Sequence, residues 1–296
     1  MPGSELFYNY LVICFDRLLQ SQQEYIKSYD HAYLFRFRVE IKKIRACLKC
    51  IENYYGKKGF QKTRKQLKKI FSRAGILREL QLYQAWFSKR HLLQLTKIIG
   101  LPEEIKERQE EFTGDSARII SAIQQNRRLV MRYARKLDQD KVYRFYIQVL
   151  KERLDLLQEE LQEGKWHKTR KQIKQLRYAR NWQDEKAKRI LSKTQTGFLD
   201  QLQHLIGDWH DNEVMIKWLK EKQKTIKGRG LTGSKKSKNA SPGEDRASAA
   251  FARAFHLMEL TRKRSRELIK NKSKRSAKVL RPLAQRLSKV DKKLTS

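Results

Sequence analysis

Apolar side chains between residues 31 and 55 recur at a spacing that fits one face of a helix. They stand alternately three and four positions apart, which is the pattern of an amphipathic helix whose apolar stripe faces a core. The stripe consists of Leu34, Phe37, Ile41, Ile44, Leu48 and Ile51. This segment is therefore predicted to be a long helix that packs on its neighbours through the stripe.

Similar patterns divide most of the chain into helices. The predicted helices cover residues 4–29, 31–55, 60–72, 77–99, a stretch from Pro102 to Gly114, 116–163, 166–182 and 248–269. Gly75 is expected to separate the third from the fourth, and 116–163 hold either one helix or two with a turn near Asp138. Residues 226–247 are polar and rich in Gly, Ser and Lys, and they are predicted to form a mobile loop. Residues 270–296 are basic and contain few core residues, and they are predicted to form a tail.

Composition supports an all-α protein. The 296 residues include 13 Gly and 4 Pro, about half of average usage. Because both residues interrupt helices, their scarcity favours helical structure. An apolar content of 39% is enough for a packed core, which argues against bulk disorder. No run of 18 apolar residues occurs, so we expect no membrane-spanning helix.

Net charge points to an anionic partner. The chain has 68 Lys and Arg against 32 Asp and Glu, a formal charge of +36. A surplus of this size attracts polyanions, and the candidates are nucleic acid, an anionic membrane surface or a free anionic polymer. Three cysteines, Cys14, Cys47 and Cys50, are too few for a disulfide framework. They fit a reduced, cytoplasmic setting better.

Two motifs occur twice at the same offset of 132 residues. The first is Arg38-x-x-x-Lys42-x-x-Arg45, which returns as Arg170-x-x-x-Lys174-x-x-Arg177. The second runs from Gly75 to Glu79 and returns from Gly207 to Asp211. A repeat of this length is a whole bundle of helices rather than a solenoid unit. The chain is therefore predicted to consist of two homologous helical halves, residues 1–140 and 141–296.

The first motif belongs to a row of positive charge that runs beside an apolar stripe. The N-terminal ladder is Arg38, Lys42, Arg45 and Lys49, and the C-terminal ladder is His167, Arg170, Lys174 and Arg177. The N-terminal ladder is about 16 Å long at the helical rise. Like charges at these spacings repel one another, so an anion that neutralises them would be favoured. Arginine forks donate bidentately to phosphate, and lysines add compact charge.

A third row of arginines follows, on the helix that precedes residue 138. It consists of Arg128, Arg132 and Arg135. A charged face exposed to solvent is the alternative interpretation of any such row. The duplication of the ladders at equivalent positions of two halves favours a binding role for them.

At these residues the chain resembles the CHAD domain (conserved histidine α-helical domain) family over about residues 5–285. The family motif resembles His-x-x-Arg-x-x-x-(Lys/Arg)-x-(Leu/Ile)-Arg in each half, followed by Gly-x-x-(Arg/Asn/His)-Asp. The stretches 167–177 and 207–211 match it well. The first half departs from it twice, because Phe35 stands at the histidine position and Glu79 replaces the Asp. Whether Phe35 or His31, one turn earlier, takes the place of the histidine is left open.

The resemblance implies a fold and a function. The fold is two pseudo-symmetric four-helix bundles around a basic central cleft. The function is binding of inorganic polyphosphate in that cleft, without catalysis and without a cofactor or metal. With the rows above, the predicted binding residues are Arg38, Lys42, Arg45, Lys49, Arg78, Arg128, Arg132, Arg135, His167, Arg170, Lys174, Arg177 and His210.

Other candidate chemistry is less well supported. Cys47-x-x-Cys50 is the only CxxC, and without two further ligands it predicts core packing or simple exposure rather than a zinc site. Glu79 and Asp211 are expected to orient an arginine or cap a helix. The five tryptophans are expected to pack in the core.

Three rival functions stay open. A nucleic-acid binder would interleave exposed aromatic residues with the basic rows, and the ladders contain almost none. A phosphohydrolase would need clustered carboxylates for a divalent metal, whereas the acids are dispersed. An accessory protein would use the cleft for a protein partner. The sequence leaves open the oligomeric state, the preferred polyphosphate length, and whether the protein associates with granules, nucleoid or neither.

Overall fold

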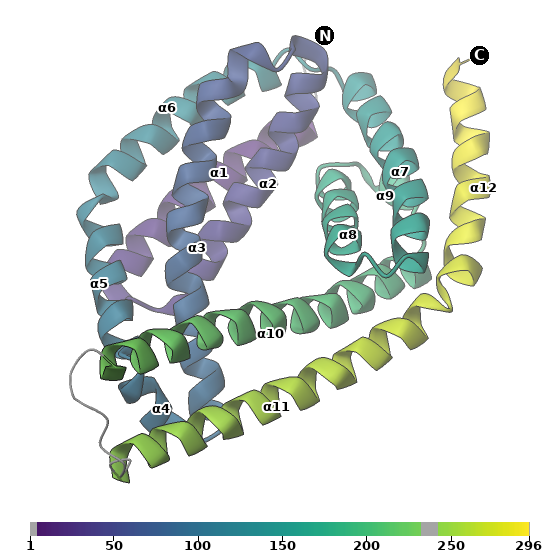
Figure 1. The fold of residues 1–296 in the computed structure, drawn as a ribbon. Coiled ribbons are helices and arrows are strands. Elements are labelled where there is room, and N and C mark those ends of the chain that lie inside the picture. The colour runs from purple at the N-terminus through teal and green to yellow at the C-terminus, as the bar shows by residue number, and fades with distance from the viewer. Residues whose placement is uncertain (1–4, 232–241, 296) are drawn as a thin grey trace.

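A computed structural model describes residues 5–231 and 242–295, and over these ranges the chain is helical, without a strand (Figure 1). The first half contains α1 (Glu5–Ser28), α2 (His31–Tyr55), the short 3-10 helix η1 (Lys58–Phe60), α3 (Gln61–Lys89), α4 (Leu93–Ile98), α5 (Leu101–Gly114) and α6 (Ser116–Ala134). The second half contains α7 (Gln139–Gln162), α8 (Trp166–Asn181), α9 (Glu185–Lys188), α10 (Lys193–Leu231), α11 (Pro242–Ser273) and α12 (Ser276–Thr295). The all-α prediction is confirmed.

Helix contacts follow the same order in both halves. α1 packs on α2 as α7 packs on α8, and α2 packs on α3 as α8 packs on α10. α6 lies against α1, and α12 lies against α7 in the same way. The pseudo-twofold axis of the two halves stays a prediction, but this order of contacts agrees with the 132-residue repeat.

The second half extends beneath the first. α10 and α11 run side by side past the lower ends of α3 and α8 (Figure 1), and α11 packs against α4. Lys222 on α10 forms an ion pair of 2.6 Å with Glu104 on α5. The rings of Tyr83 and Trp218 lie 4.6 Å apart and join α3 to α10. α10 and α11 therefore lie beneath helices of both halves, and we call this pair of helices the floor.

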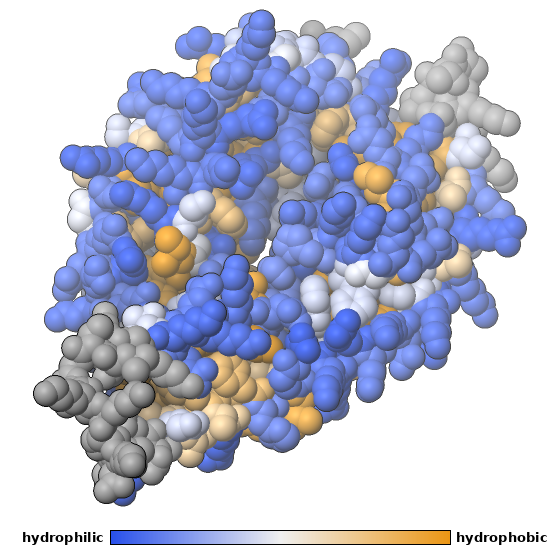
Figure 2. All heavy atoms as spheres, in the orientation of Figure 1, coloured by the Kyte–Doolittle hydropathy of each residue, from blue (hydrophilic) through white to orange (hydrophobic). Residues whose placement is uncertain are grey.

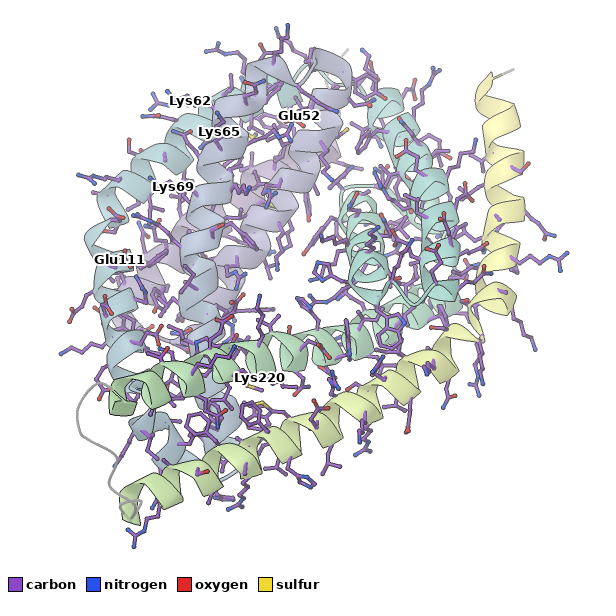
Figure 3. The ribbon with its side chains drawn as sticks, in the orientation of Figure 1. Glu52, Lys62, Lys65, Lys69, Glu111 and Lys220 are labelled. Atoms are coloured by element: carbon purple, nitrogen blue, oxygen red, sulfur yellow. The ribbon has the colours of Figure 1, made fainter. Side chains whose placement is uncertain are left out.

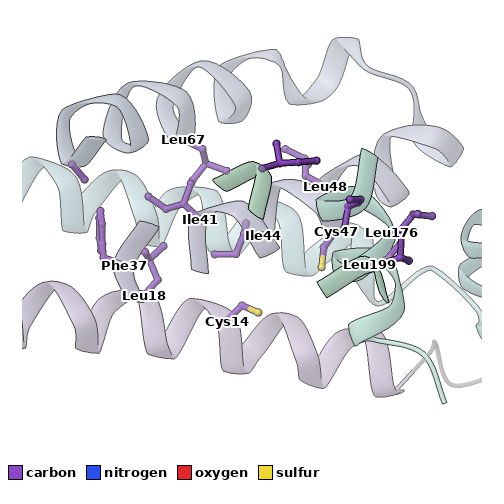
Figure 4. Packing of buried hydrophobic residues seen from close by; sticks show 14 of the residues in the cluster. Cys14, Leu18, Phe37, Ile41, Ile44, Cys47, Leu48, Leu67, Leu176 and Leu199 are labelled. Atoms are coloured by element: carbon purple, nitrogen blue, oxygen red, sulfur yellow. The ribbon is translucent and has the colours of Figure 1, made fainter. Parts of the chain in front are cut away.

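α2 shows how the sequence pattern becomes packing. Its carboxylate cap is Asp30, which accepts a 2.8 Å hydrogen bond from the amide of Ala32. Gly56 ends the helix with a φ of 79°, a conformation that favours glycine. The whole predicted stripe is buried in the core (Figure 4). All three cysteines are buried and free, as expected for core residues.

One predicted boundary in the first half differs from the structure, and one choice that the sequence left open is decided. Gly75 does not separate two helices, because α3 continues through it. Residues 116–163 form two helices with a turn near Asp138, which is one of the two predicted alternatives. The side chain of Asp138 caps the second helix by accepting from the amide of Lys141 at 2.7 Å. The predicted boundary of the halves near residue 140 falls at this turn.

The C-terminal region is more ordered than its composition predicts. α10 continues to Leu231 and α11 begins at Pro242, so both helices extend into the predicted loop 226–247. Residues 232–241 of that prediction lie outside the described residues. The predicted basic tail is wrong over 276–295, which form α12. α12 packs on α7 and buries Leu280, Leu283 and Leu287.

Candidate functional site

The two ladders lie across from each other where α2 packs against α8. At one end, Lys49 Nζ donates to Gln175 Oε1 of α8 at 3.4 Å. Figure 3 shows nitrogen-ended side chains from both halves projecting toward the space between α3 and α8. The surface is hollowed there and bordered largely by hydrophilic residues (Figure 2). We call this space the cleft.

The pKa values of Lys42 and Lys174, one lysine from each ladder, are lowered in part by cations of the opposite half. Burial, followed by the charges of Arg38 and Arg170, lowers the pKa of Lys42 to about 8. Burial, followed by Arg170 and Lys42, lowers the pKa of Lys174 to about 7. Arg38 also lowers the pKa of Lys174. Positive charge is therefore concentrated in the cleft beyond what the protein alone neutralises.

The duplicated glycine motif explains how the first arginine of each ladder is held. A Cβ added at Gly75 of α3 would lie 3.3 Å from Arg38 Nη2, and one at Gly207 of α10 would lie 3.3 Å from Arg170 Nη2. Arg38 Nη1 also donates to the carbonyl oxygen of Gly75 at 3.4 Å. The bare helix surface thus receives a flat guanidinium in both halves, and any Cβ at these positions would force the guanidinium to shift by a few tenths of an ångström.

An aromatic ring lies beneath the N-terminal ladder. Phe71 of α3 lies 4.6 Å from Arg38 Cζ, 5.3 Å from Lys42 Nζ and 5.8 Å from Arg45 Cζ, measured to the ring centroid. Cations near an aromatic face are attracted to it. The sequence analysis missed Phe71. Its spacing of four residues before Gly75, on the same face of α3, was the available signal.

Two acidic residues of the repeated motif lie near the ladders. Asp211 raises the pKa of Arg78, partly offsetting the larger lowering by burial. Burial raises the pKa of Glu79, while Arg38 lowers it and Asp211 raises it. The acids thus lie near one another and near the arginines, which fits the predicted orienting role. In the described chain, no group of three His, Cys, Asp or Glu side chains is placed to hold a metal ion.

Buried donors without partners lie on the same arginines. Among the described residues, Arg38 Nε, Arg170 Nε and both Nε and Nη1 of Arg78 are buried and have no hydrogen-bond partner. Leaving a charged donor unpaired costs more than leaving a neutral one. An anion that reached these groups would supply acceptors that the protein does not.

The outer ends of the ladders are less alike. Arg177 forms an ion pair with Asp200 at 2.9 Å and donates to Gln203 at 3.0 Å, both on α10. The side chain of Arg45 lies beside Phe71 and is accessible to solvent at its surface. Partial desolvation lowers the pKa of Arg45, and the charge of the nearby Arg64 lowers it further. One outer arginine is therefore partly neutralised and the other is not.

The repeated positions at Phe35 and His167 carry different pairs. In the first half, Arg78 Cζ lies 5.7 Å from the ring centroid of Phe35. In the second half, the rings of His167 and His210 lie 4.6 Å apart. His31 bonds to Asp30 at 2.9 Å instead. Phe35, not His31, therefore occupies the structural place of the histidine.

The third predicted row belongs to another part of the surface. Arg128 and Arg132 are exposed on α6, and Arg135 Nη2 donates to the hydroxyl of Tyr8 on α1 at 2.8 Å. Among the described residues, the charges that shift the ladder pKa values come from α2, α3, α7, α8 and α10, and none comes from α6. A role for this row in binding stays a prediction.

A separate row of lysines lies on α3. Lys62, Lys65 and Lys69, here the outer row, are exposed on the side of α3 that faces α6 (Figure 3). Lys69 lines a 220 Å³ pocket with Arg118 of α6. The outer row is on a different side of α3 from Phe71 and Gly75. It therefore provides a comparison of equal charge outside the cleft.

The family model for the CHAD domain matches residues 9–220. The chain belongs to the CHAD-domain family. This CHAD domain is also similar to the crystal structure of the CHAD domain from the plant Ricinus communis, with a TM-score of 0.67 and 15% sequence identity over 91% of each chain. At that identity the likeness shows the fold. No curated protein matches the chain.

Membership agrees with the motifs that the sequence analysis singled out. Both ladders and both glycine motifs lie within the matched residues. α11 and α12 lie beyond them, although α11 packs on the first half. In the described part of this CHAD domain, no helix is long and apolar enough to cross a membrane.

Proposed function

We propose that this CHAD domain binds inorganic polyphosphate in the cleft between its two ladders and does not hydrolyse it. The CHAD family is associated with polyphosphate. The observation that carries the proposal is the pair of facing lysines, Lys42 and Lys174, whose pKa values fall to about 8 and about 7. Burial lowers both pKa values most, and repulsion among the neighbouring cations lowers them further. A polyanion between the two lysines would offset that repulsion.

The geometry suits a linear chain of phosphates. Arg38 and Arg170 are held flat against Gly75 and Gly207, so their forks are preorganised. Bidentate arginine donors and compact lysine charges match the oxygens of a phosphate chain. Binding at such a site depends on salt, because it releases counterions from the polyanion.

Single-stranded nucleic acid is the main rival ligand, since it carries the same backbone charge. It gains affinity when its bases stack on open aromatic faces. The aromatic rings beside the ladders are Phe35 and Phe71, and arginines lie against both. Three cations of the protein lie over Phe71, and Arg78 lies against Phe35, which stays 53% exposed. The cations compete with bases for these rings, which favours a ligand without bases.

Competition binding tests the proposal. Labelled long-chain polyphosphate would be displaced by unlabelled long-chain polyphosphate, by short phosphates, and by single- and double-stranded DNA at matched salt. We expect long-chain polyphosphate to compete best per charge. If DNA competes better per charge, the nucleic-acid function replaces the proposed one.

A further inference from the structure

The two halves place different chemistry at one pair of equivalent positions. Phe35 and His167 are related by the 132-residue offset, and so are Arg78 and His210. The first pair forms a cation–aromatic contact of 5.7 Å, and the second forms a contact between imidazole rings of 4.6 Å. The backbone positions are repeated, whereas the side-chain chemistry is not.

The pair in the first half carries a permanent charge. Arginine stays protonated at any physiological pH, and its planar group lies well against an aromatic face. Burial is the largest influence on the pKa of Arg78 and lowers it. An arginine side chain nevertheless keeps its proton in proteins. Phe35 is 53% exposed and lies at the cleft side of α2 with Arg78 against it. This pair therefore presents a fixed cation.

The pair in the second half can change its charge. Histidine is the side chain whose ordinary pKa allows titration near neutrality. Two protonated imidazoles 4.6 Å apart would repel each other. In the free protein this disfavours the doubly charged pair, and a phosphate beside the two rings would favour it.

The surroundings of the histidine pair are mainly cationic. The charged groups that shift the pKa values of the pair are Arg170, Lys171 and Lys174 on α8 and Asp211 on α10. On the neighbouring helices, Asp208 of α10 interacts with His204 and Arg170, and Arg266 of α11 lies 5.7 Å from the ring of Trp166, next to His167 in the sequence. Burial lowers the pKa of both histidines, and Arg170 and Lys174 lower them further. Asp211 opposes this effect at His210. The pair is therefore biased towards its neutral form until an anion arrives.

We propose that the cleft contains two unequal phosphate sites, a fixed-charge site at Arg78 held by Phe35 and a proton-accepting site at His167 and His210. Polyphosphate binding is then accompanied by proton uptake in the second half. The proton comes from solvent and adds to an imidazole nitrogen, and the resulting N–H donates to a phosphate oxygen. This inference rests on the proposed function, and it assigns a different role to each half.

The internal repeat supplies the test. Calorimetric titration with long-chain polyphosphate near pH 6.5, in buffers of different ionisation enthalpy, measures the number of protons taken up. The variant H167F/H210R gives the second half the pair of the first, and F35H/R78H does the reverse. Lys174 interacts with both histidines, so a permanent charge at residue 210 would alter its own proton uptake. All proteins therefore also carry Lys174→Met, which removes that contribution from the comparison.

We expect H167F/H210R to bind polyphosphate with about one to two fewer protons than Lys174→Met alone. F35H/R78H should take up more protons. Each proton linked to binding makes the affinity fall about tenfold per pH unit as pH rises through the titration range. The control is H31F, which removes an exposed histidine outside the cleft and should leave proton uptake unchanged.

The outcomes separate the two proposals. Absence of polyphosphate binding by the unaltered protein would remove the proposed function itself. Binding with the same proton number with and without H167F/H210R would overturn the inference of unequal sites alone. If H167F/H210R does not fold, F35H/R78H decides, and unchanged proton uptake in that variant also overturns the inference.

Discussion

Replacing Lys174 by methionine is expected to stabilise the free protein and weaken its binding of polyphosphate. Methionine is unbranched and fills the space of the lysine stem without its charge. Folding lowers the pKa of Lys174 from 10.5 to about 7, mainly through burial and then through Arg170 and Lys42. The folded protein is therefore penalised for keeping this lysine protonated.

The pH range of the penalty follows from the direction of the shift. A lysine whose pKa is lowered by folding destabilises the folded state in full below the folded value, here about 7. The penalty is relieved as pH rises from there towards the unfolded value of 10.5. The stabilising effect of K174M is thus largest at pH 6 and smaller at alkaline pH.

The shift sets an upper limit on the effect. At about 1.4 kcal/mol per pKa unit, a change from 10.5 to about 7 corresponds to at most about 5 kcal/mol. Lys174 keeps some contact with solvent, and screening reduces the value, so we expect a gain of about 1–2 kcal/mol. In a chain of 296 residues that raises the Tm by roughly 1.5–3 °C.

Thermal melts without polyphosphate, at pH 6 and pH 9.5, measure this effect. K174M should melt higher than the unaltered protein at pH 6, and the difference should shrink by more than half at pH 9.5. K171M is the matched control, because Lys171 is exposed on the same helix. An unchanged Tm for K174M at pH 6, or an equal rise in K171M, would refute the electrostatic reasoning.

Three further predictions concern the same site. Replacing Arg170, Lys174 and Arg177 together by alanine should flatten the slope of log affinity against log salt by up to about three units. Replacing the three lysines of the outer row by alanine should flatten the slope much less. Equal losses of affinity in the two variants would mean that binding depends only on the total charge. Gly207→Ala should weaken polyphosphate binding by displacing Arg170, with a free energy of unfolding unchanged or raised by up to about 1 kcal/mol. Gly197→Ala is its control, since nothing lies within 4 Å of a Cβ there, and a loss of affinity in both variants would contradict the proposed contact. Purified protein should release no phosphate from polyphosphate or nucleotides with magnesium or manganese, and turnover that disappears in Asp211→Ala would show catalysis instead.

The sequence predicted those helices whose apolar stripe, cap and terminal residue all lie within or next to the helix itself. The boundaries of α2 follow from its apolar stripe, its cap at Asp30 and its end at Gly56, all of which lie within or beside the helix. Gly75 was misjudged because the reason for a glycine there is a guanidinium from another helix. α12 was missed because only Leu280, Leu283 and Leu287 form its buried stripe among many basic residues.

The candidate site was predictable to a similar extent. Repetition pointed to the ladders without any knowledge of which helices would meet. The sequence could not show that Phe71 lies under three cations or that Arg78 lies against Phe35, since each contact joins α2 to α3. A row of like charge on α6 resembles a ladder in sequence, and only the packing of that helix against α1 distinguishes it.

The floor formed by α10 and α11 also affects how the protein is made. α4 emerges from the ribosome well before α11, with which it packs, and 149 residues separate the starts of the two helices, Leu93 and Pro242. At usual synthesis rates this leaves α4 without that partner for on the order of ten seconds. During that time the apolar residues near α4 need other cover, from a chaperone or from temporary contacts. A fragment ending at residue 220 lacks α11, which packs on α4, and α12, which packs on α7. We therefore expect it to keep both ladders yet bind a hydrophobic dye that the whole chain does not, and equal dye binding by the two would show that the apolar faces near α4 and α7 are covered without these helices.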